Sequence, residues 1–308
     1  DADGYSFRAE RQLVCDAGLE EMVLSPDQSL LAARDSMQNI YVWRVEDFEL
    51  LNRFQPEFAE AFEAVPLQGI NFNANNQLVS ISDNGMECRD VQTGDIIWET
   101  EGSSPRTIQF NRRQSLLLVD WGEELQVFDT ATGQMTARTD AYTTQVHVAF
   151  SPDDRYVAYS TDLEGKNTCV IWDMNSGSVN LIQNEAWENR TVSSIVFAGK
   201  ENVIISCSGL LAESALTVAG NMTMYRAETL EPVWSNENYA HHMKCYYKGD
   251  DTEFNDPILV DISGTDVRRV DGATGAIDAI SQAFYVEYVR PISESSYFSK
   301  SSSRMDKS

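Results

Sequence analysis

The sequence predicts an all-β fold of the β-propeller class, in which four-stranded sheets, called blades, follow one another along the chain. Three observations support this prediction. A short turn motif recurs at intervals of 39 to 53 residues, strand segments recur upstream of it, and the two ends of the chain complement each other. Intervals of this length are typical of one propeller blade per repeat.

The turn motif is an apolar or aromatic pair, often followed by Asp, and then a turn that ends in Thr-Gly or Ser-Gly. Four copies keep the glycine and two weaker copies lack it. The residues at the Asp position are Arg44, Asp90, Asp129, Asp173, Arg226 and Asp271. These copies predict six complete four-stranded blades.

Two strand segments recur upstream of the motif. The first ends in an aromatic residue or Leu and a polar turn, as in residues 148–153, and the second is mostly apolar, as in residues 156–159. Inner strands of a blade are covered by neighbouring blades on both faces, so continuous apolar runs are expected there. We therefore predict that five aromatic residues are buried between blades, namely Phe72, Phe110, Phe150, Trp172 and Phe197.

The blade boundaries follow from the same repeat. We predict a single propeller over residues 1–308, with blades at about 20–60, 61–100, 101–140, 141–185, 186–238 and 239–282. The segment around Phe7 resembles an outermost strand, and residues 283–304 resemble first and second strands. We expect residues 3–14 and 283–304 to form a composite seventh blade, because closing the ring removes exposed strand edges. The alternative is part of a longer array with a Ser-rich, partly disordered tail at 293–308.

Two stretches carry a family resemblance. Phe-Ser-Pro-Asp-Asp-Arg-Tyr-Val-Ala at 150–158 and Val-Ile-Trp-Asp at 170–173 resemble WD40 repeats, of the degenerate YVTN/WD40 type common in bacteria. The resemblance covers nearly the whole chain and implies the propeller part of a larger bacterial multidomain protein, tethered to an upstream effector domain. No Gly-His dipeptide precedes the first strand of a blade, so we expect no Asp-His hydrogen-bond network.

The net charge and the cysteine content limit which partners and which compartment the sequence predicts. The formal net charge of −25 opposes the phosphate backbone and anionic membranes, so nucleic acid is not expected as a partner, nor is membrane insertion. The five cysteines are widely spaced, which does not resemble a disulfide framework. We expect reduced thiols and a cytoplasmic chain.

Few residues could support catalysis or bind a metal ion. His241, His242 and Cys245 are the one metal-like cluster, but successive strand residues point to opposite faces, and we expect a structural role. His147 is predicted as a core or channel histidine. The Ser-rich segment 206–209 is predicted as a structural turn, and the acidic segment 250–256 lacks the glycine and glutamate spacing of a calcium loop.

Trp98 and Trp234 lie four residues past their turns, which is similar to the tryptophan-docking repeats of quinoprotein dehydrogenase propellers. No vicinal cysteine pair or calcium-ligand set accompanies them. We expect these two tryptophans to pack between blades without a catalytic role.

The sequence therefore predicts no catalytic, cofactor-binding or metal-binding residue, and no cofactor. We expect a non-enzymatic module that binds a partner protein; the alternative is a small-ligand or enzyme propeller, quinoprotein-like or hydrolase-associated, that uses the central channel. Insertions at Asp162–Asn167, Leu210–Ala219 and Lys248–Asp256 are the first places to look. The candidate aromatic anchors are Trp121, Trp187, Tyr246 and Tyr247, although core packing is the alternative for each.

Overall fold

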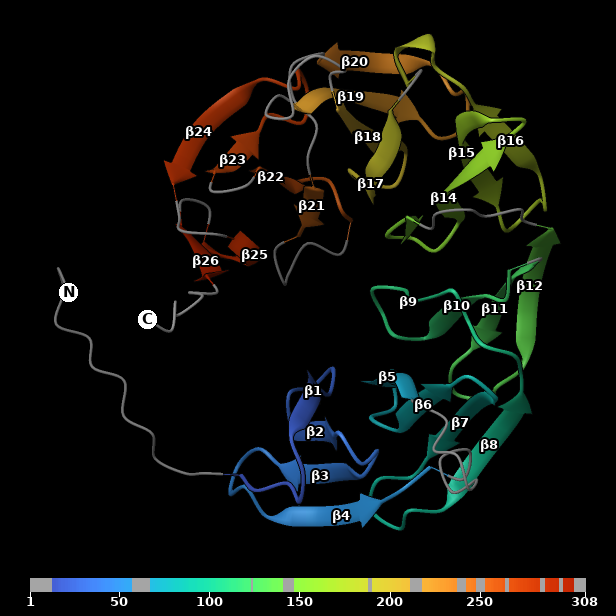
Figure 1. The fold of residues 1–308 in the computed structure, drawn as a ribbon, viewed down its shortest axis with the longest axis vertical. Coiled ribbons are helices and arrows are strands. Elements are labelled where there is room, and N and C mark those ends of the chain that lie inside the picture. The colour runs from blue at the N-terminus through green and yellow to red at the C-terminus, as the bar shows by residue number, and fades with distance from the viewer. Residues whose placement is uncertain are drawn as a thin grey trace, which may run out of the picture. The chain divides into compact units, whose positions relative to one another are not determined.

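In the computed structural model, most of the described residues lie in β-strands (Figure 1). The described residues are 13–56, 67–122, 124–140, 147–187, 190–210, 218–236, 242–247, 253–263, 266–282, 286–293 and 296–301. The chain divides into two compact units, one of Asp1–Trp121 with Leu125–Arg138, the other of Gly122–Glu124 with Thr139–Ser308. Among the described residues, no helix is long and apolar enough to cross a membrane.

The first unit contains three antiparallel four-stranded sheets. Blade 1 consists of β1 (Leu19–Leu24), β2 (Leu30–Asp35), β3 (Ile40–Arg44) and β4 (Leu50–Phe54). Blade 2 consists of β5 (Leu67–Phe72), β6 (Leu78–Ser82), β7 (Gly85–Arg89) and β8 (Ile96–Glu101). Blade 3 consists of β9 (Thr107–Phe110), β10 (Leu116–Asp120), β11 (Glu124–Asp129) and β12 (Met135–Asp140).

The second unit contains three further four-stranded sheets and a two-stranded one. Blade 4 consists of β13 (Val148–Phe150), β14 (Tyr156–Leu163), β15 (Lys166–Asp173) and β16 (Val179–Ile182), and the 3-10 helix η2 (Glu185–Trp187) follows it. Blade 5 consists of β17 (Thr191–Phe197), β18 (Asn202–Leu210), β19 (Val218–Arg226) and β20 (Pro232–Asn236). Blade 6 consists of β21 (His242–Tyr246), β22 (Ile258–Ser263), β23 (Asp266–Val270) and β24 (Ile277–Gln282), and β25 (Val286–Ser293) then pairs with β26 (Ser296–Ser301).

The predicted fold class is therefore confirmed: within the described ranges the chain forms six four-stranded sheets in chain order. The strand proposed near Phe7 lies outside the described residues, so closure of a seventh blade stays a prediction, as does the single domain over 1–308. The two C-terminal strands expected beyond residue 283 are present as β25 and β26.

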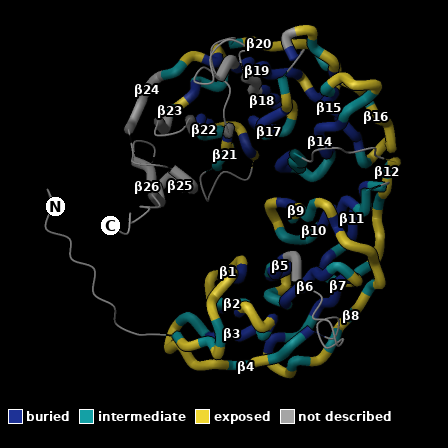
Figure 2. Tube along the Cα trace, in the orientation of Figure 1, coloured by how far each residue is buried: buried dark blue, intermediate teal, exposed yellow. Residues whose placement is uncertain are grey.

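In blades 1 to 5, burial separates the second and third strands from the outermost strand (Figure 2). The second strand of blade 2, β6, is buried at every position, whereas its outermost strand, β8, alternates between half-buried and exposed side chains. An inner strand has a neighbouring blade against each face, so both sets of side chains must be apolar or small. The outermost strands have one face exposed to solvent, so their side chains alternate between half-buried and exposed.

The turn between the third and fourth strand explains the repeat motif. In blade 4, the Asp173 carboxylate accepts hydrogen bonds from the N–H groups of Asn175 and Ser176, and Gly177 N–H donates to the Asp173 carbonyl at 2.8 Å. Gly177 has a φ of 74°, in the left-handed region that favours glycine. Phe48 and Leu230 adopt similar values of 59° and 60° in the two copies that lack glycine. The turn geometry is thus kept without its preferred residue.

In blade 1, a buried carboxylate network lies at the end of β2. Asp35 is fully buried and accepts hydrogen bonds from Asn39 and from the Tyr41 hydroxyl at 3.0 Å. The Tyr41 oxygen in turn accepts Asp16 N–H at 2.9 Å. These partners satisfy the buried charge without a histidine.

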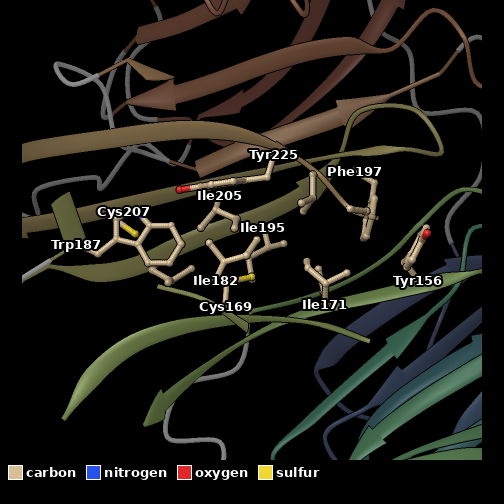
Figure 3. Close-up of a cluster of buried hydrophobic side chains, with 14 residues drawn as sticks. Tyr156, Cys169, Ile171, Ile182, Trp187, Ile195, Phe197, Ile205, Cys207 and Tyr225 are labelled. Atoms are coloured by element: carbon tan, nitrogen blue, oxygen red, sulfur yellow. The ribbon is translucent and has the colours of Figure 1, made fainter. Parts of the chain in front are cut away.

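Apolar clusters fill the space between consecutive blades of one unit. One joins blades 4 and 5 and includes Trp187, Tyr225 and Phe197 (Figure 3), and another joins blades 2 and 3. Of the five aromatic residues predicted to be buried, Phe72, Trp172 and Phe197 are buried. Phe110 and Phe150 are only half-buried, because each ends a short innermost strand.

Trp98 links blades 2 and 3. Its indole Nε1 donates to the Thr130 carbonyl at 3.0 Å. The ring also lies against Gly133, where an added Cβ would come within 2.6 Å of the indole Cδ2. A tryptophan on one blade thus packs on the turn glycine of the next, which supports the predicted packing role.

Trp234 repeats this arrangement between blades 5 and 6. Its Nε1 donates to the Gly272 carbonyl at 3.0 Å, and its ring would meet a Cβ on Gly275 at 2.6 Å. Two independent copies of one geometry indicate a recurrent link between consecutive blades. In both copies the indole ring fills the space that a Cβ on the glycine would occupy.

Candidate functional site

The histidines do not assemble a site in the described part of the chain. His147 donates its backbone N–H to Ser160 Oγ at 3.1 Å, and its side chain is half-buried. His241 lies outside the described residues, and His242 begins β21. Across the described residues, no three His, Cys, Asp or Glu side chains are grouped as a metal ion would require.

The thiols are placed for packing. Cys88, Cys169 and Cys207 are buried, and burial raises the pKa of both Cys88 and Cys207 to about 12. The thiolate is the reactive form of cysteine, so these groups are poor nucleophiles near neutral pH. The expectation that residues 206–209 form a turn is wrong, because they lie within β18 and pair with residues 219–222 of β19.

The three predicted insertions have different outcomes. The segment 162–167 is no insertion: β14 and β15 run on to a two-residue turn at Glu164 and Gly165, which have φ values of 55° and 78°. Residues 211–217 and 248–252 lie outside the described residues. The described end of the third insertion, 253–256, contacts blade 5, where Lys200 Nζ lies 2.9 Å from Glu253 Oε2.

The four candidate aromatic anchors are at least half-buried. Trp187 is 1% exposed and belongs to the core between blades 4 and 5, so it is unavailable as an anchor. Trp121 is half-buried, and its ring lies against Gly102. Tyr246 and Tyr247 are half-buried as well.

Tyr247 holds the turn between the first two strands of blade 5. Its hydroxyl accepts Gly199 N–H at 2.9 Å and donates to the Phe197 carbonyl at 3.0 Å. Its ring meets Phe254 edge-on, with centroids 5.3 Å apart. The Lys200 ammonium group lies over the same Phe254 ring, 5.9 Å from its centroid. The first-strand turns of blades 5 and 6 are therefore fixed to each other.

This fixed region belongs to what we call the turn surface, defined as residues 151–156, 198–202, 226–229, 253–257 and 271–275. In an antiparallel blade the first and third connections emerge at the same edge of the sheet, so these segments share one edge of blades 4 to 6. Two hollows flank the turn at 198–202. One, of about 440 Å³, is bordered by Lys200, Phe254 and Gly272; the other, of about 200 Å³, is bordered by Arg155, Arg226 and Glu228.

Arg155 is the most constrained cation of the turn surface. Its Nε and Nη2 lie 3.1 and 3.0 Å from Asp173 Oδ2, and its guanidinium lies 4.6 Å from the Tyr156 ring centroid. Burial opposes ionisation of Asp173, but hydrogen bonds from Ser176 N–H and Arg155 outweigh it and hold its pKa below the usual value. The guanidinium thus presents one face to solvent while its other contacts fix its position.

Arg155, Lys200 and Arg226 keep side-chain exposures between 36% and 52%, beside the acidic Glu201, Glu228 and Glu253. In a chain of net charge −25, the lining of the hollow of about 200 Å³ balances three cations with three carboxylates, whereas the turn surface as a whole carries more carboxylates than cations. Sequence reasoning did not select these residues. The sequence feature that could have indicated them is a basic residue in the turns of an otherwise acidic chain.

Comparison with known proteins shows the fold and no more. No family model matches the sequence, and no curated protein matches it. Several solved structures are similar to this chain. The structure of the RRP9 WD40 repeats matches at 10% sequence identity with a TM-score of 0.57, and the match covers 91% of this chain and 85% of that one. U3-55K matches at 10% identity and 0.56, covering 91% and 86%. BamB from Moraxella catarrhalis matches at 11% identity and 0.61, covering 92% and 82%. The chain therefore has a WD40-like β-propeller fold.

Proposed function

We propose that this chain is a non-catalytic module that binds a partner protein through the turn surface of blades 4 to 6. The observation that carries the proposal is the set of three cations and three carboxylates that lines the hollow of about 200 Å³ at this edge. Arg and Tyr are favoured in protein interfaces, and a fixed surface loses little conformational entropy on binding.

The charges of the turn surface favour a protein over other ligands. Each of the three cations already has a carboxylate within 4 Å, so a phosphate or polyanion would have to displace an existing pair. A partner with its own mixture of acidic and basic side chains can bridge these pairs without leaving a buried charge. The proposal also includes the absence of turnover. The serine hydroxyls that donate to carboxylates, such as Ser151 to Asp153 and Ser25 to Asp27 at 2.7 Å, belong to the turns that follow first strands.

A partner-capture experiment tests the binding surface. The chain is immobilised and its partners are crosslinked, with Lys200→Glu and Arg226→Glu compared against Lys166→Glu, an exposed change on β15 at the opposite end of blade 4. We expect a protein retained by the wild type and by Lys166→Glu to be lost from both turn-surface variants. Circular dichroism confirms that each variant is folded. Equal retention by all four chains would contradict the proposal.

An activity screen tests the absence of turnover separately. Esters, glycosides, peptides and quinone-linked alcohols are offered to the purified chain. We expect no turnover above a heat-denatured control. Reproducible turnover that one substitution at a hollow abolishes would overturn the proposal in favour of an enzyme.

A further inference from the structure

The outermost strand of blade 4 differs from those of blades 1, 2, 5 and 6. In β4, β8, β20 and β24 the pairing register with the third strand shifts once, which marks a β-bulge. In β16 the register with β15 runs without a shift from Val179 to Ile182. Bulges twist an edge away from further pairing, so β16 presents the flatter edge.

β16 also lacks the side chains that usually protect an edge. The other five outermost strands each contain a charged residue or a proline, namely Arg53, Glu99, Arg138, Pro232 and Asp278. The four residues of β16 are Val, Asn, Leu and Ile, and Val179 and Leu181 are 43% and 48% exposed. An apolar, uncharged edge without a bulge is the kind that accepts another strand.

The hydrogen-bonding groups of this edge can be assigned from the turn before it. Asp173 N–H donates to the Ser178 carbonyl at 2.9 Å, so residues 173 and 178 form a hydrogen-bonded pair. Pairs alternate along an antiparallel ladder, and β16 has no register shift, so Val179 and Leu181 are non-hydrogen-bonded to β15. Their N–H and C=O groups therefore point away from the sheet, and in the described structure β16 is the last strand of its sheet.

A groove lies beside this edge on the side of blade 5. It has a volume of about 580 Å³ and is lined by Leu181 and Ile182 from β16 and by Tyr225, Leu230 and Pro232 from blade 5. The Tyr225 hydroxyl accepts a hydrogen bond from Asn184 Nδ2 at 2.7 Å. The rest of the lining is polar and includes Gln183, Thr223 and Ser235. Side chains of an added strand that point toward blade 5 would enter this groove and meet both its apolar and its polar residues.

The charge around the groove is acidic. Glu185 is the one charged side chain of its lining, and the exposed Glu231 lies between Leu230 and Pro232 of that lining. Together with a net charge of −25, this favours a segment that carries Lys or Arg and disfavours pairing with a second copy of the chain.

We propose that β16 binds a partner protein by strand addition: an extended segment with apolar residues at alternate positions, flanked by Lys or Arg, pairs with Val179 and Leu181 and fills the groove of blade 5. The inference rests on the proposed function only in requiring a protein ligand, since its surface is separate from the turn surface.

Amide hydrogen exchange with a defined peptide tests the geometry. The probe is Lys-Val-Thr-Val-Thr-Val-Lys, and the control is the same peptide with Glu at both ends. In the free chain, we expect the amides of Val179 and Leu181 to exchange quickly and those of Asn180 and Ile182 slowly. The basic peptide slows exchange at Val179 and Leu181 by about tenfold or more, whereas the acidic peptide leaves it unchanged. Slow exchange at Val179 and Leu181 in the free chain, or equal effects of both peptides, would overturn the inference.

Two substitutions at one position test the pairing itself. Leu181→Pro removes an N–H that points away from β15, so the sheet keeps its own hydrogen bonds, whereas Leu181→Thr keeps the N–H and shortens the side chain. We expect Leu181→Pro to weaken peptide binding about tenfold relative to Leu181→Thr, measured by fluorescence anisotropy.

The turn-surface variant Lys200→Glu should bind the peptide like the wild type. If Leu181→Pro binds the peptide normally while turn-surface variants lose a protein partner, strand addition is wrong and the proposed function survives. Self-association that Leu181→Pro abolishes, seen by sedimentation, would replace the basic segment by a second copy and overturn the inference as stated.

Discussion

The contact between Trp98 and Gly133 predicts a specific coupling between two substitutions. Gly133 has a φ of 70°, and a Cβ built there would lie 2.6 Å from Cδ2 and 2.7 Å from Cε3 of the indole. Gly133→Ala therefore has two costs: about 1 kcal/mol for left-handed backbone, after the gain from a stiffer unfolded chain, and the displacement of the indole. Displacement breaks the 3.0 Å bond to the Thr130 carbonyl, worth about 1 kcal/mol, and exposes apolar ring surface worth about another 1 kcal/mol.

The total is about 3 kcal/mol for Gly133→Ala in the wild-type chain. In a Trp98→Ala background the indole is gone, so only the backbone cost of about 1 kcal/mol should remain. The coupling free energy is the difference, about 2 kcal/mol, which is in the range found for residues in contact. The Thr130 carbonyl keeps a second donor, Asn73 Nδ2 at 3.0 Å, so Trp98→Ala leaves no unsatisfied acceptor.

Urea unfolding of the four chains measures the coupling. Gly165→Ala is the matched control, because Gly165 has a φ of 78° but no described heavy atom within 4 Å of the added Cβ. It should cost only the backbone term. Equal costs of Gly133→Ala with and without Trp98 would refute the docking geometry, and the same cycle on Trp234 and Gly275 provides an independent repeat.

Three further predictions concern separate parts of the chain. Native labelling with a maleimide at pH 8, read by mass spectrometry, should modify Cys15 and Cys245 before Cys88 and Cys207, whose pKa is raised to about 12 by burial; early modification of Cys88 or Cys207 would contradict this. Hydrogen bonds from Thr93 hold the pKa of Asp90 below its unfolded value, and hydrogen bonds from Thr274 do the same for Asp271. The two carboxylates therefore stabilise the fold above about pH 4, and this stabilisation is lost as the pH falls through their folded pKa. Asp90→Asn and Asp271→Asn should flatten the dependence of unfolding midpoint on pH between 6 and 3, and an unchanged slope would show that other carboxylates cause it. Tyr247→Phe removes both hydrogen bonds of the hydroxyl and should destabilise by about 1–3 kcal/mol, measured by urea unfolding; a change near zero would mean that solvent replaces them.

The repeat motif made the blades predictable because its chemistry is local. Asp129 accepts hydrogen bonds from Ala131 N–H and Thr132 N–H, and Gly133 N–H donates to the Asp129 carbonyl, so a short stretch of sequence contains both partners of each bond. The segment 206–209 shows where such reasoning fails: Ser and Gly suggest a turn, but pairing with residues 219–222 keeps them in a strand. Pairing of that kind is set by a partner strand and cannot be seen in the segment itself.

The candidate surfaces were less predictable than the fold for a related reason. Arg155 and Lys200 belong to different blades, and their closeness depends on how consecutive sheets stack. The open edge of β16 is hard to predict, because blade 4 keeps the turn motif with its glycine and nothing within that motif indicates that the following bulge is missing. The indication comes only from comparison, since β16 lacks the extra residue that β20 and β8 contain.

Asn52 shows that the link between blades is a property of register rather than of tryptophan. It pairs with Val42 in blade 1, as Trp98 pairs with Cys88 in blade 2, so both hold the same place relative to their bulges. A Cβ on Gly94, the turn glycine of blade 2, would lie 3.0 Å from Asn52 Nδ2. The side chain at this register therefore packs on the next turn glycine whether it is an indole or an amide. A search for tryptophans finds two such links. A search for the residue that follows the bulge also finds the third, because backbone pairing fixes where the side chain points.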